Sequence, residues 1–457
     1  MASLEDRLSQ FSSPVQMLRN AQIGPYVFPV AAEFSNWRDE QRSWRESVAL
    51  IDQSYHMTDL YVSGPDVMKL VSSLAVNSFA NFGRDKAKQF VACNYDGYLI
   101  GDMVIFGLED DLVAIVGRPA VANWVQFHAE TGGFDVAVER DERSVSNPGP
   151  RKIFRYELQG PRAWALLEKL NGGPLPEFKF FQMGEVTIAG QTLRALRHGM
   201  AGAPGLEFWG PVALAARIKA AILEAGREFG LEQVGGRAYS TIAIESGWIP
   251  SPLPAVYTGE QMRPYRQWLG ADSFEAVSSL GGSMASDDIQ DYYLTPWDLD
   301  YGRLIKFDHE FIGRAALERM ASRPHRRKVT LEWNKDDVLS VYASQLQEGD
   351  NGKFMEMPAA HYATHPYDRV EFGGRAAGIS TYPVYLHPDR AWISLATLDA
   401  DAASLDGEVT IIWGEENGGT AKPVVERHFQ KKVRARVAPW PWSKTAREQY
   451  RPRPPAP

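Results

Sequence analysis

The pattern of apolar and polar positions predicts the same supersecondary unit at two places in the chain. LYVSGPDVMKLVSSL (Leu60 to Leu74) alternates as a strand does, turns at a Gly-Pro pair, and continues with the spacing of an amphipathic helix. YELQGPRAWALLEKL (Tyr156 to Leu170) repeats this order, and Gly160 follows Gly64 by 96 positions (160 − 64). The repeat predicts two related α+β halves that pack together, with a ligand site between them.

Further strands and helices complete both predicted halves. Short apolar runs at 88–94, 98–108 and 111–117 predict three successive strands, and 119–133 predicts a helix. The most regular helical pattern spans 211–230. Its apolar face consists of Leu214, Ile218, Ile222 and Phe229.

A change of pattern near Arg327 predicts a third unit. Its strand-like runs are separated by turns, and they are KVTLEWN, GGRAAGIS, AWISLATLD and EVTIIWG. This succession is typical of a small antiparallel barrel. We therefore expect three domains, at residues 1–150, 151–325 and 326–457, and the last ends in a disordered proline-rich tail.

Composition narrows the class of protein without identifying it. The 457 residues carry a net charge of −8 and are 44% hydrophobic, which is ordinary for a soluble globular protein. An acidic chain lacks the basic footprint of a nucleic-acid binder, so Arg326, Arg327 and Lys328 are interpreted as a solvated surface run. The polar start of the chain and the lack of a long apolar run predict no signal peptide, no membrane span and a cytoplasmic location. We expect a monomer or a weak homo-oligomer.

Metal chemistry has little support in the sequence. Cys93 is the only cysteine, which excludes a disulfide framework and a cysteine zinc site within one chain. His361 and His365 are four residues apart, but Pro366 follows at once and no Glu follows the first histidine, as the H-E-x-x-H zinc motif requires. The two histidines are therefore interpreted as loop residues, and no metal site is predicted.

Two neighbouring segments carry the strongest chemical signal. RHGMAGAPGLEFWG (Arg197 to Gly210) surrounds one acid, Glu207, with four glycines, and RAYSTIAIESGWIPSPLPAVYTG (Arg237 to Gly259) follows after a helix. Glycine lets a backbone approach a flat ligand closely, and a carboxylate can accept two ring N–H hydrogen bonds. The segments predict a site for such a ligand, with Tyr239 near it.

Three segments also carry a family resemblance. HGMAGAPGLE (His198 to Glu207), RAYSTIAIESGW (Arg237 to Trp248) and KFDHEFIGRAAL (Lys306 to Leu317) resemble segments of the glycine-cleavage T-protein, or aminomethyltransferase, superfamily. The resemblance covers nearly the whole chain. It implies a three-domain, ring-like α+β fold with two related α/β halves, a C-terminal antiparallel β-barrel, and tetrahydrofolate in the central opening.

Further motifs resemble a narrower group, the tetrahydrofolate-dependent aryl O-demethylases. These motifs are EFSNWRDEQRSWR, VGRPAVANW, RHGMAGAPGLEFWGP, ESGWIPSPLPAVYTG and IIWGEENGGT. Enzymes of that group demethylate vanillate, 3-O-methylgallate or syringate in the breakdown of lignin-derived aromatics. The resemblance implies methyl transfer from a methoxybenzoate to N5 of tetrahydrofolate, a co-substrate, and the three substrates stay open alternatives.

Two departures from the T-protein pattern favour the narrower group. The chain has Gly101-Asp102 where the T-protein has a catalytic Asp-Asp pair, and Tyr239 where the T-protein has an arginine. A tyrosine, with a reference pKa of about 10, matches the phenol that ether cleavage releases. The resemblance therefore implies Tyr239 as the proton donor to the ether oxygen, a role that contributes roughly 10²- to 10⁴-fold in rate.

The resemblance assigns the other site residues to the two ligands. Glu207 would hold the pterin ring through paired hydrogen bonds, Val116 would contact the cofactor, and Trp248 would form the wall where folate meets substrate. Arg118, at a predicted strand-to-helix turn, would pair with the substrate carboxylate. His56 would bind a ring hydroxyl or relay a proton. The further substrate contacts implied are Gln53, Tyr26 and Phe28.

Two alternatives remain open at this point. One is an aminomethyltransferase, or an enzyme that demethylates a methylamine such as dimethylglycine; Arg118 suits that carboxylate too, whereas Tyr239 argues against it. The other is a non-catalytic folate-binding protein of the same fold. Such proteins typically carry a reactive cysteine motif, and Cys93 lies in no such context.

Overall fold

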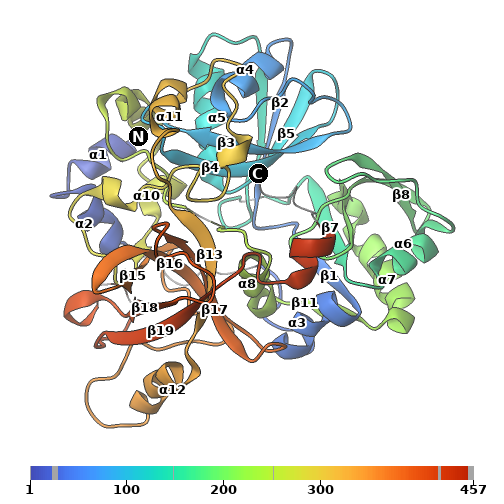
Figure 1. Ribbon diagram of the computed structural model, residues 1–457. Coiled ribbons are helices and arrows are strands. Elements are labelled where there is room, and N and C mark those ends of the chain that lie inside the picture. The colour runs from blue at the N-terminus through green and yellow to red at the C-terminus, as the bar shows by residue number, and fades with distance from the viewer. Residues whose placement is uncertain are drawn as a thin grey trace.

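Two α+β halves and a barrel make up the chain, and they occupy the top, the right and the lower left of Figure 1. The computed structural model describes residues 2–22, 29–147, 149–250, 252–419, 422 and 424–450. Tyr26, Phe28 and the predicted tail at 451–457 lie outside these residues.

The first half is an antiparallel five-stranded sheet in the order β3-β4-β5-β2-β6. Its strands are β2 (Thr58–Ser63), β3 (Ala87–Cys93), β4 (Leu99–Gly107), β5 (Leu112–Gly117) and β6 (Ala137–Asp141). Helices α4 (Val67–Leu74) and α5 (Pro119–Thr131) pack against each other, and α5 lies on the sheet. The strands and helix predicted between residues 88 and 133 are confirmed.

The second half repeats this arrangement with one strand added. Its sheet has the order β8-β9-β10-β7-β1-β11, in which only the β1–β11 pair is parallel. The strands are β1 (Val48–Asp52), β7 (Ile153–Gln159), β8 (Met183–Ile188), β9 (Gln191–Leu196), β10 (Gly205–Pro211) and β11 (Leu231–Val234), and the helices are α6 (Ala163–Asn171) and α7 (Ala215–Gly226). Without β1, the strand order is that of the first half.

Equivalent glycines begin the turn after the first strand of each repeat. Gly64 has φ +131° and Gly160 has φ +137°, a region that L side chains rarely adopt. A Cβ would lie 2.6 Å from the carbonyl oxygen of Asp135 at the first position and 2.4 Å from that of Ser47 at the second. Both the conformation and the close backbone therefore require glycine, and the predicted repeat is confirmed.

The helix predicted at 211–230 is correct in its centre and wrong at its start. Pro211 ends β10 in the structure, and α7 begins at Ala215 after a short 3-10 turn. Ile218 and Ile222 are fully buried against the sheet, as the pattern predicted. Gly230, with φ +67°, ends a second short turn after α7.

The C-terminal unit is a closed antiparallel barrel in the order β13-β17-β16-β15-β18-β19. Its strands are β13 (Arg327–Trp333), β15 (Asp368–Phe372), β16 (Arg375–Leu386), β17 (Ala391–Leu398), β18 (Glu408–Trp413) and β19 (Lys431–Ala438). Trp333 and Trp413 fill its interior, and α12 (Lys335–Ser344) packs against β19. The predicted barrel is confirmed, although β15 and β19 were not among the predicted strands.

The remaining helices join these units. The shorter ones pack around the first half: α1 (Leu4–Leu8), α2 (Pro14–Arg19), α9 (Arg263–Trp268), α10 (Phe274–Val277) and α11 (Arg314–Met320). Helices α3 (Trp37–Glu46) and α8 (Gly236–Glu245) lie between the second half and the barrel (Figure 1). Arg45 fixes this junction, because it forms ion pairs of 2.7 Å with both Glu245 and Asp389.

The three-domain division stays a prediction, but the sheets qualify its boundaries. β1 precedes the first sheet in sequence, yet it pairs with β7 and β11 of the second. Within the described residues, none of the helices has the length and apolar character needed to cross a bilayer.

Candidate active site

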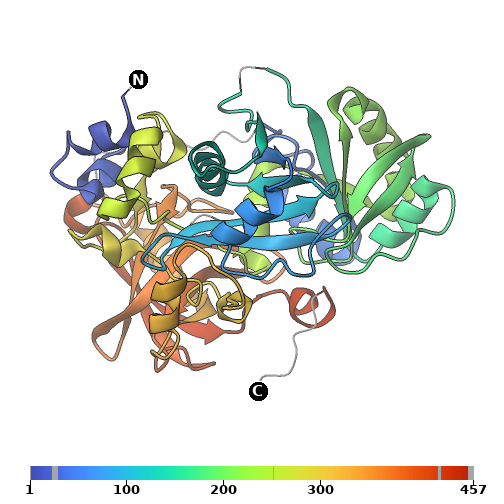
Figure 2. The ribbon, with the colours of Figure 1, turned by 90° about the horizontal axis from the view of Figure 1, so that it is seen from above.

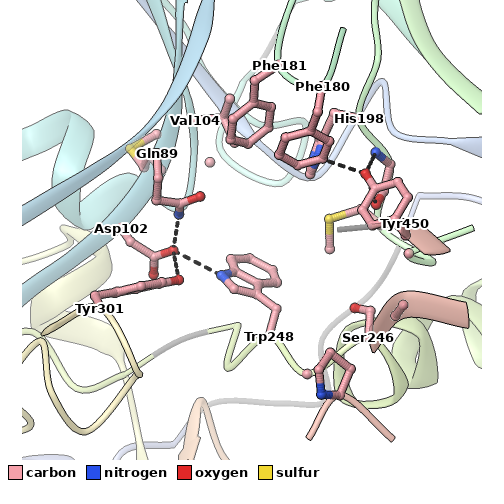
Figure 3. A pocket seen from close by; sticks show the side chains of 18 of the residues that line it. Gln89, Asp102, Val104, Phe180, Phe181, His198, Ser246, Trp248, Tyr301 and Tyr450 are labelled. Carbon is pink, nitrogen blue, oxygen red and sulfur yellow. Dashed lines mark hydrogen bonds between the residues drawn. The ribbon is translucent and has the colours of Figure 1, made fainter. Parts of the chain in front are cut away.

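A cavity lies where the first-half sheet, the second-half sheet and the end of the chain meet (Figure 3). Strands β3 to β5 contribute Gln89, Asp102, Val104 and Val116 to its lining. The glycine-rich loop at 197–204 contributes His198, Gly199, Met200 and Gly202. The residues after α8 contribute Ser246, Gly247 and Trp248, and the chain end contributes Trp440, Pro441, Ala446 and Tyr450.

Glu207 is held in the wall of this cavity by a buried arginine. It lies in the middle of β10, is 4% exposed, and accepts a hydrogen bond from Arg155 Nη1. The guanidinium of Arg155 packs on the rings of Phe106 and Trp209, at 5.1 and 5.2 Å from their centroids. Arg155 also bonds Asp59 at 2.9 Å, so it ties the second half to β2 of the first. The predicted binding carboxylate is thus buried, ion-paired and fixed in position.

The glycine-rich loop is shaped by contacts with β7. A Cβ at Gly199 would overlap the side chain of Gln159, and one at Gly205 would lie 1.8 Å from the carbonyl oxygen of Leu158. Gln159 Oε1 accepts the N–H of Ala201 at 2.8 Å. The glycines therefore serve the packing of the loop itself, and Gly199 and Gly202 also reach the cavity surface.

Asp102 organises the opposite wall. Its Oδ2 accepts hydrogen bonds from Trp248 Nε1 at 3.0 Å, from Tyr301 Oη at 2.9 Å and from Gln89 Nε2 (Figure 3). Burial raises the pKa of this carboxyl. The indole of Trp248 is thereby fixed at the cavity surface, where the sequence predicted an aromatic wall.

Lys328 corrects the interpretation of the basic run. Arg326 and Arg327 are exposed, but Lys328 is 6% exposed, lines the cavity and has its Nζ 3.9 Å from the centre of the Trp440 ring. The expectation of a wholly solvated run was therefore wrong. Side chains alternate between the two sides of β13, and Lys328 lies on the side that faces the cavity. That expectation rested only on the charge of the run and not on this alternation.

The end of the chain forms another part of the wall. The last described turn, Ala446–Tyr450, leaves the barrel and reaches the second half (Figure 2). Tyr450 Oη accepts the N–H of Gly199 at 2.6 Å and lies 3.2 Å from His198 Nδ1. The ring of Phe180 stands edge-on to Tyr450, with centroids 5.5 Å apart. No motif in the sequence pointed to this contact, because it depends on contacts between distant parts of the chain.

Tyr239 and His56 form a hydrogen-bonded pair. Tyr239 Oη, on α8, lies 2.8 Å from His56 Nε2, which follows β1, and the two rings meet edge to face with centroids 5.0 Å apart. His56 is buried, and burial together with the charge of Arg118 lowers its pKa to about 3. The imidazole is therefore neutral at physiological pH. Neither residue is among those that line the cavity of Glu207.

Arg118 lies in a second, smaller hollow. It is the N-cap residue of α5, where the sequence predicted a strand-to-helix turn, and Pro252 and Phe274 lie in the same hollow. Asp102 lines both this hollow and the larger cavity. The structure therefore brings Gln53, Trp248 and Val116 together with Glu207, and it leaves Arg118 on the other side of Asp102.

Metal and thiol chemistry gain no support from the geometry. Among the described residues, no three His, Cys, Asp or Glu side chains cluster as metal ligands would. His361 lies in a loop as predicted, whereas His365 begins a two-residue strand, β14 (His365–Pro366). Cys93 is buried in β3, and burial raises the pKa of its thiol, so it lacks the character of a reactive cysteine.

Known proteins resemble this chain in sequence and in fold. It is 46% identical to syringate O-demethylase from Sphingobium sp. (strain NBRC 103272 / SYK-6), over 98% of this chain and 97% of that protein. It is 29% identical to sesamin methylene transferase from Sinomonas sp. (strain No.22), over 93% and 94%. The aminomethyltransferase T of the Bartonella henselae glycine cleavage system shares the fold, with a TM-score of 0.62 at 17% identity, over 93% and 95%.

A family model matches more than half of the chain. Residues 8–251 match the GCVT N-terminal domain, and this range includes both halves and the pair formed by Tyr239 and His56. The resemblance expected from the motifs is confirmed, and the chain belongs to the GCVT family within the aminomethyltransferase superfamily.

Proposed function

We propose that this protein is a tetrahydrofolate-dependent O-demethylase of a methoxylated benzoate. It would transfer the ether methyl group to tetrahydrofolate and release the phenol and 5-methyltetrahydrofolate. The 46% identity to a syringate O-demethylase over nearly the full length supports this class of reaction. Syringate, vanillate and 3-O-methylgallate are the candidate substrates, in the catabolism of lignin-derived aromatics. The observation that carries the proposal is the 2.8 Å contact of Tyr239 with a neutral His56.

The larger cavity fits tetrahydrofolate in shape and charge. Glu207 is a fixed carboxylate that can accept the paired N–H groups of a pterin edge. The flat indole of Trp248 and the apolar side chain of Val116 offer surface for the ring. Lys328 and Arg303 add positive charge to the lining, which suits the anionic glutamate end of a folate. Tetrahydrofolate, when bound, supplies the nitrogen N5 that accepts the methyl group.

Tyr239 would act as the general acid. Ether cleavage leaves a phenolate, and a proton from Tyr239 Oη to that oxygen makes it a better leaving group. Because His56 is neutral, it can carry its proton on Nε2, and this N–H can donate a hydrogen bond to Tyr239 Oη. The hydroxyl proton of Tyr239 then points to the substrate, and the imidazole N–H stabilises the tyrosinate that forms. This tautomer is our hypothesis, and it gives His56 a positioning role.

Arg118 would hold the substrate carboxylate. The positive charge of Arg118 lowers the pKa of His56. Arg118 is therefore within electrostatic range of His56 and of Tyr239, the proposed acid, which contacts His56. It caps the start of α5, where the helix dipole also favours an anion. A charge-assisted hydrogen bond of this kind contributes about 1.5–3 kcal/mol. Arg118 thus lies in the proposed substrate hollow, and Asp102 lies at the boundary between that hollow and the folate cavity.

The direct test is a product assay. The protein is incubated with each of the three methoxybenzoates, with and without tetrahydrofolate, and both 5-methyltetrahydrofolate and the demethylated phenol are quantified. We expect equal amounts of the two products from at least one substrate, and neither product without tetrahydrofolate. Absence of both products with all three substrates would overturn the proposal. Formation of 5-methyltetrahydrofolate and sarcosine from dimethylglycine would favour the methylamine alternative instead.

A further inference from the structure

Two buried carboxyl groups face each other beside the folate cavity. Strands β7 and β10 are antiparallel, and Glu157 lies directly opposite Glu207 in their register. Residues in such a pair project to the same side of the sheet, with Cβ atoms about 4.5–5.5 Å apart. Glu157 is 0% exposed and Glu207 is 4% exposed, so water screens neither of them. Like charges in this arrangement repel each other strongly.

The nearby cation, Arg155, pairs with Glu207 and not with Glu157. Arg155 bonds Glu207 and Asp59, and no ion pair to Glu157 occurs within the described residues. Glu157 Oε2 accepts the N–H of Met200 at 3.1 Å, whereas its Oε1 is buried and has no hydrogen bond of normal geometry within that part of the chain. The side chain of Gln53 lies close enough to Glu157 to oppose the rise of its pKa. A buried carboxylate without a cation is costly, and a protonated carboxyl can instead donate through its O–H. Burial and the charge of Glu207 hold the pKa of Glu157 well above its usual range.

We propose that Glu157 is a neutral carboxylic acid that positions Glu207 and the glycine-rich loop for tetrahydrofolate. One oxygen receives the N–H of Met200, a residue that lines the cavity. The other carries the proton, and this O–H donates a hydrogen bond to the carboxylate of Glu207. Glu157 thereby couples the binding carboxylate to the loop that forms the neighbouring wall. This role rests on the proposed function, because the ligand it prepares for is tetrahydrofolate.

The proton can be observed without any ligand. Infrared spectra of the ligand-free wild-type protein and of Glu157→Gln are subtracted at neutral pH. We expect a carbonyl band of a protonated carboxylic acid in the wild type that is lost in the variant. Glu185→Gln is the matched control, because Glu185 is an exposed carboxylate on β8 of the same sheet. A difference spectrum with only carboxylate bands would overturn the proposal.

The positioning role is tested by tetrahydrofolate binding, measured by calorimetry. Glutamine keeps one N–H donor and one carbonyl acceptor, so Glu157→Gln should bind within about threefold of the wild type. Glu157→Ala removes both groups, and its Kd should rise about 10- to 100-fold, with kcat at saturating tetrahydrofolate changed much less than KM. Equal weakening in both variants would overturn the role. A wild type that binds no tetrahydrofolate would overturn the proposed function, while the infrared band would still decide the protonation of Glu157.

Discussion

The two halves share one framework but differ at two equivalent places. Three residues before its turn glycine, the first half has Tyr61 opposite Ala114, whereas the second half has Glu157 opposite Glu207. The first half joins its second and third sheet strands through the short link 108–111, and the second half through the glycine-rich loop 197–204. An acidic pair and a longer loop, together with the added strand β1, therefore distinguish the half that contributes Glu207 to the cavity from the half that does not.

The halves are nevertheless not independent. A buried chain of charges runs from Glu207 through Arg155 to Asp59 of β2, and Arg151 continues it to Asp141 of β6 at 3.3 Å. Glu207, the carboxylate that we propose binds the pterin, is thus fixed by residues of both sheets. We therefore expect substitutions in the cavity to affect the binding of tetrahydrofolate and of methoxybenzoate differently. Substitutions in the shared turns should instead lower the stability of the whole fold.

The largest expected effect is on the chemical step. Tyr239→Phe removes the proposed proton donor, so kcat should fall about 10²- to 10⁴-fold, while the Kd of tetrahydrofolate stays near the wild-type value. Steady-state kinetics and calorimetry measure the two quantities. Tyr95→Phe, in the link between β3 and β4, is a control outside the cavity lining and should keep kcat. Unchanged turnover of Tyr239→Phe would remove it as the acid.

The second-largest expected effect is on the binding of tetrahydrofolate, with little change in the binding of methoxybenzoate. Glu207→Gln removes the charge that would accept the pterin N–H groups, and two charge-assisted hydrogen bonds at about 1.5 kcal/mol each predict a rise in tetrahydrofolate Kd of about 100-fold. Methoxybenzoate binding should change little, because Arg118 lies in the other hollow. Arg155 loses a partner as well, so thermal unfolding is measured alongside. Equal loss of both ligands would contradict the separation.

The shared turns test the equivalence of the halves. Gly64→Ala and Gly160→Ala each force a side chain into a glycine-only conformation and against a carbonyl oxygen. Each should lower the free energy of unfolding by about 2–4 kcal/mol, measured by denaturant titration. Gly83→Ala is the control, because its φ is not positive and a Cβ there meets nothing within 4 Å. A large effect at only one turn would show that the framework is not shared.

How much the sequence predicts depends on whether a signal is local. The Gly-Pro turns, Glu207 and the barrel follow from local pattern or motif, and all are found. Glu157 alternates with apolar neighbours and so resembles a solvent-facing strand residue, but both faces of β7 are covered. Tyr450 and the insertion of β1 depend on pairing between distant parts of the chain. Those features follow from tertiary packing, which periodicity cannot specify.

A smaller effect tests the contact of the chain end with the loop of the second half. Tyr450→Phe removes the acceptor of the Gly199 N–H but keeps the ring against Phe180. The loss of one hydrogen bond, about 1 kcal/mol, predicts a rise in tetrahydrofolate KM of about fivefold with little change in kcat. Tyr342→Phe, whose hydroxyl bonds the backbone within the barrel, is the control. A fall in kcat alone would contradict a binding role.

The smallest expected effect is the absence of a pH response from His56. Arginines from both halves, Arg118 and Arg155, assist burial in lowering its pKa to about 3, so its charge does not change between pH 5 and 8. Since the folded-state pKa lies below the unfolded value of about 6.5, the stability that neutral His56 contributes is present above pH 6.5 and is lost as the pH falls towards 3. The pH profile of kcat/KM should therefore have no inflection near 6.5, even though the free energy of unfolding decreases as the pH falls below 6.5. An inflection near 6.5 that His56→Gln abolishes would mean that the halves do not hold the imidazole neutral.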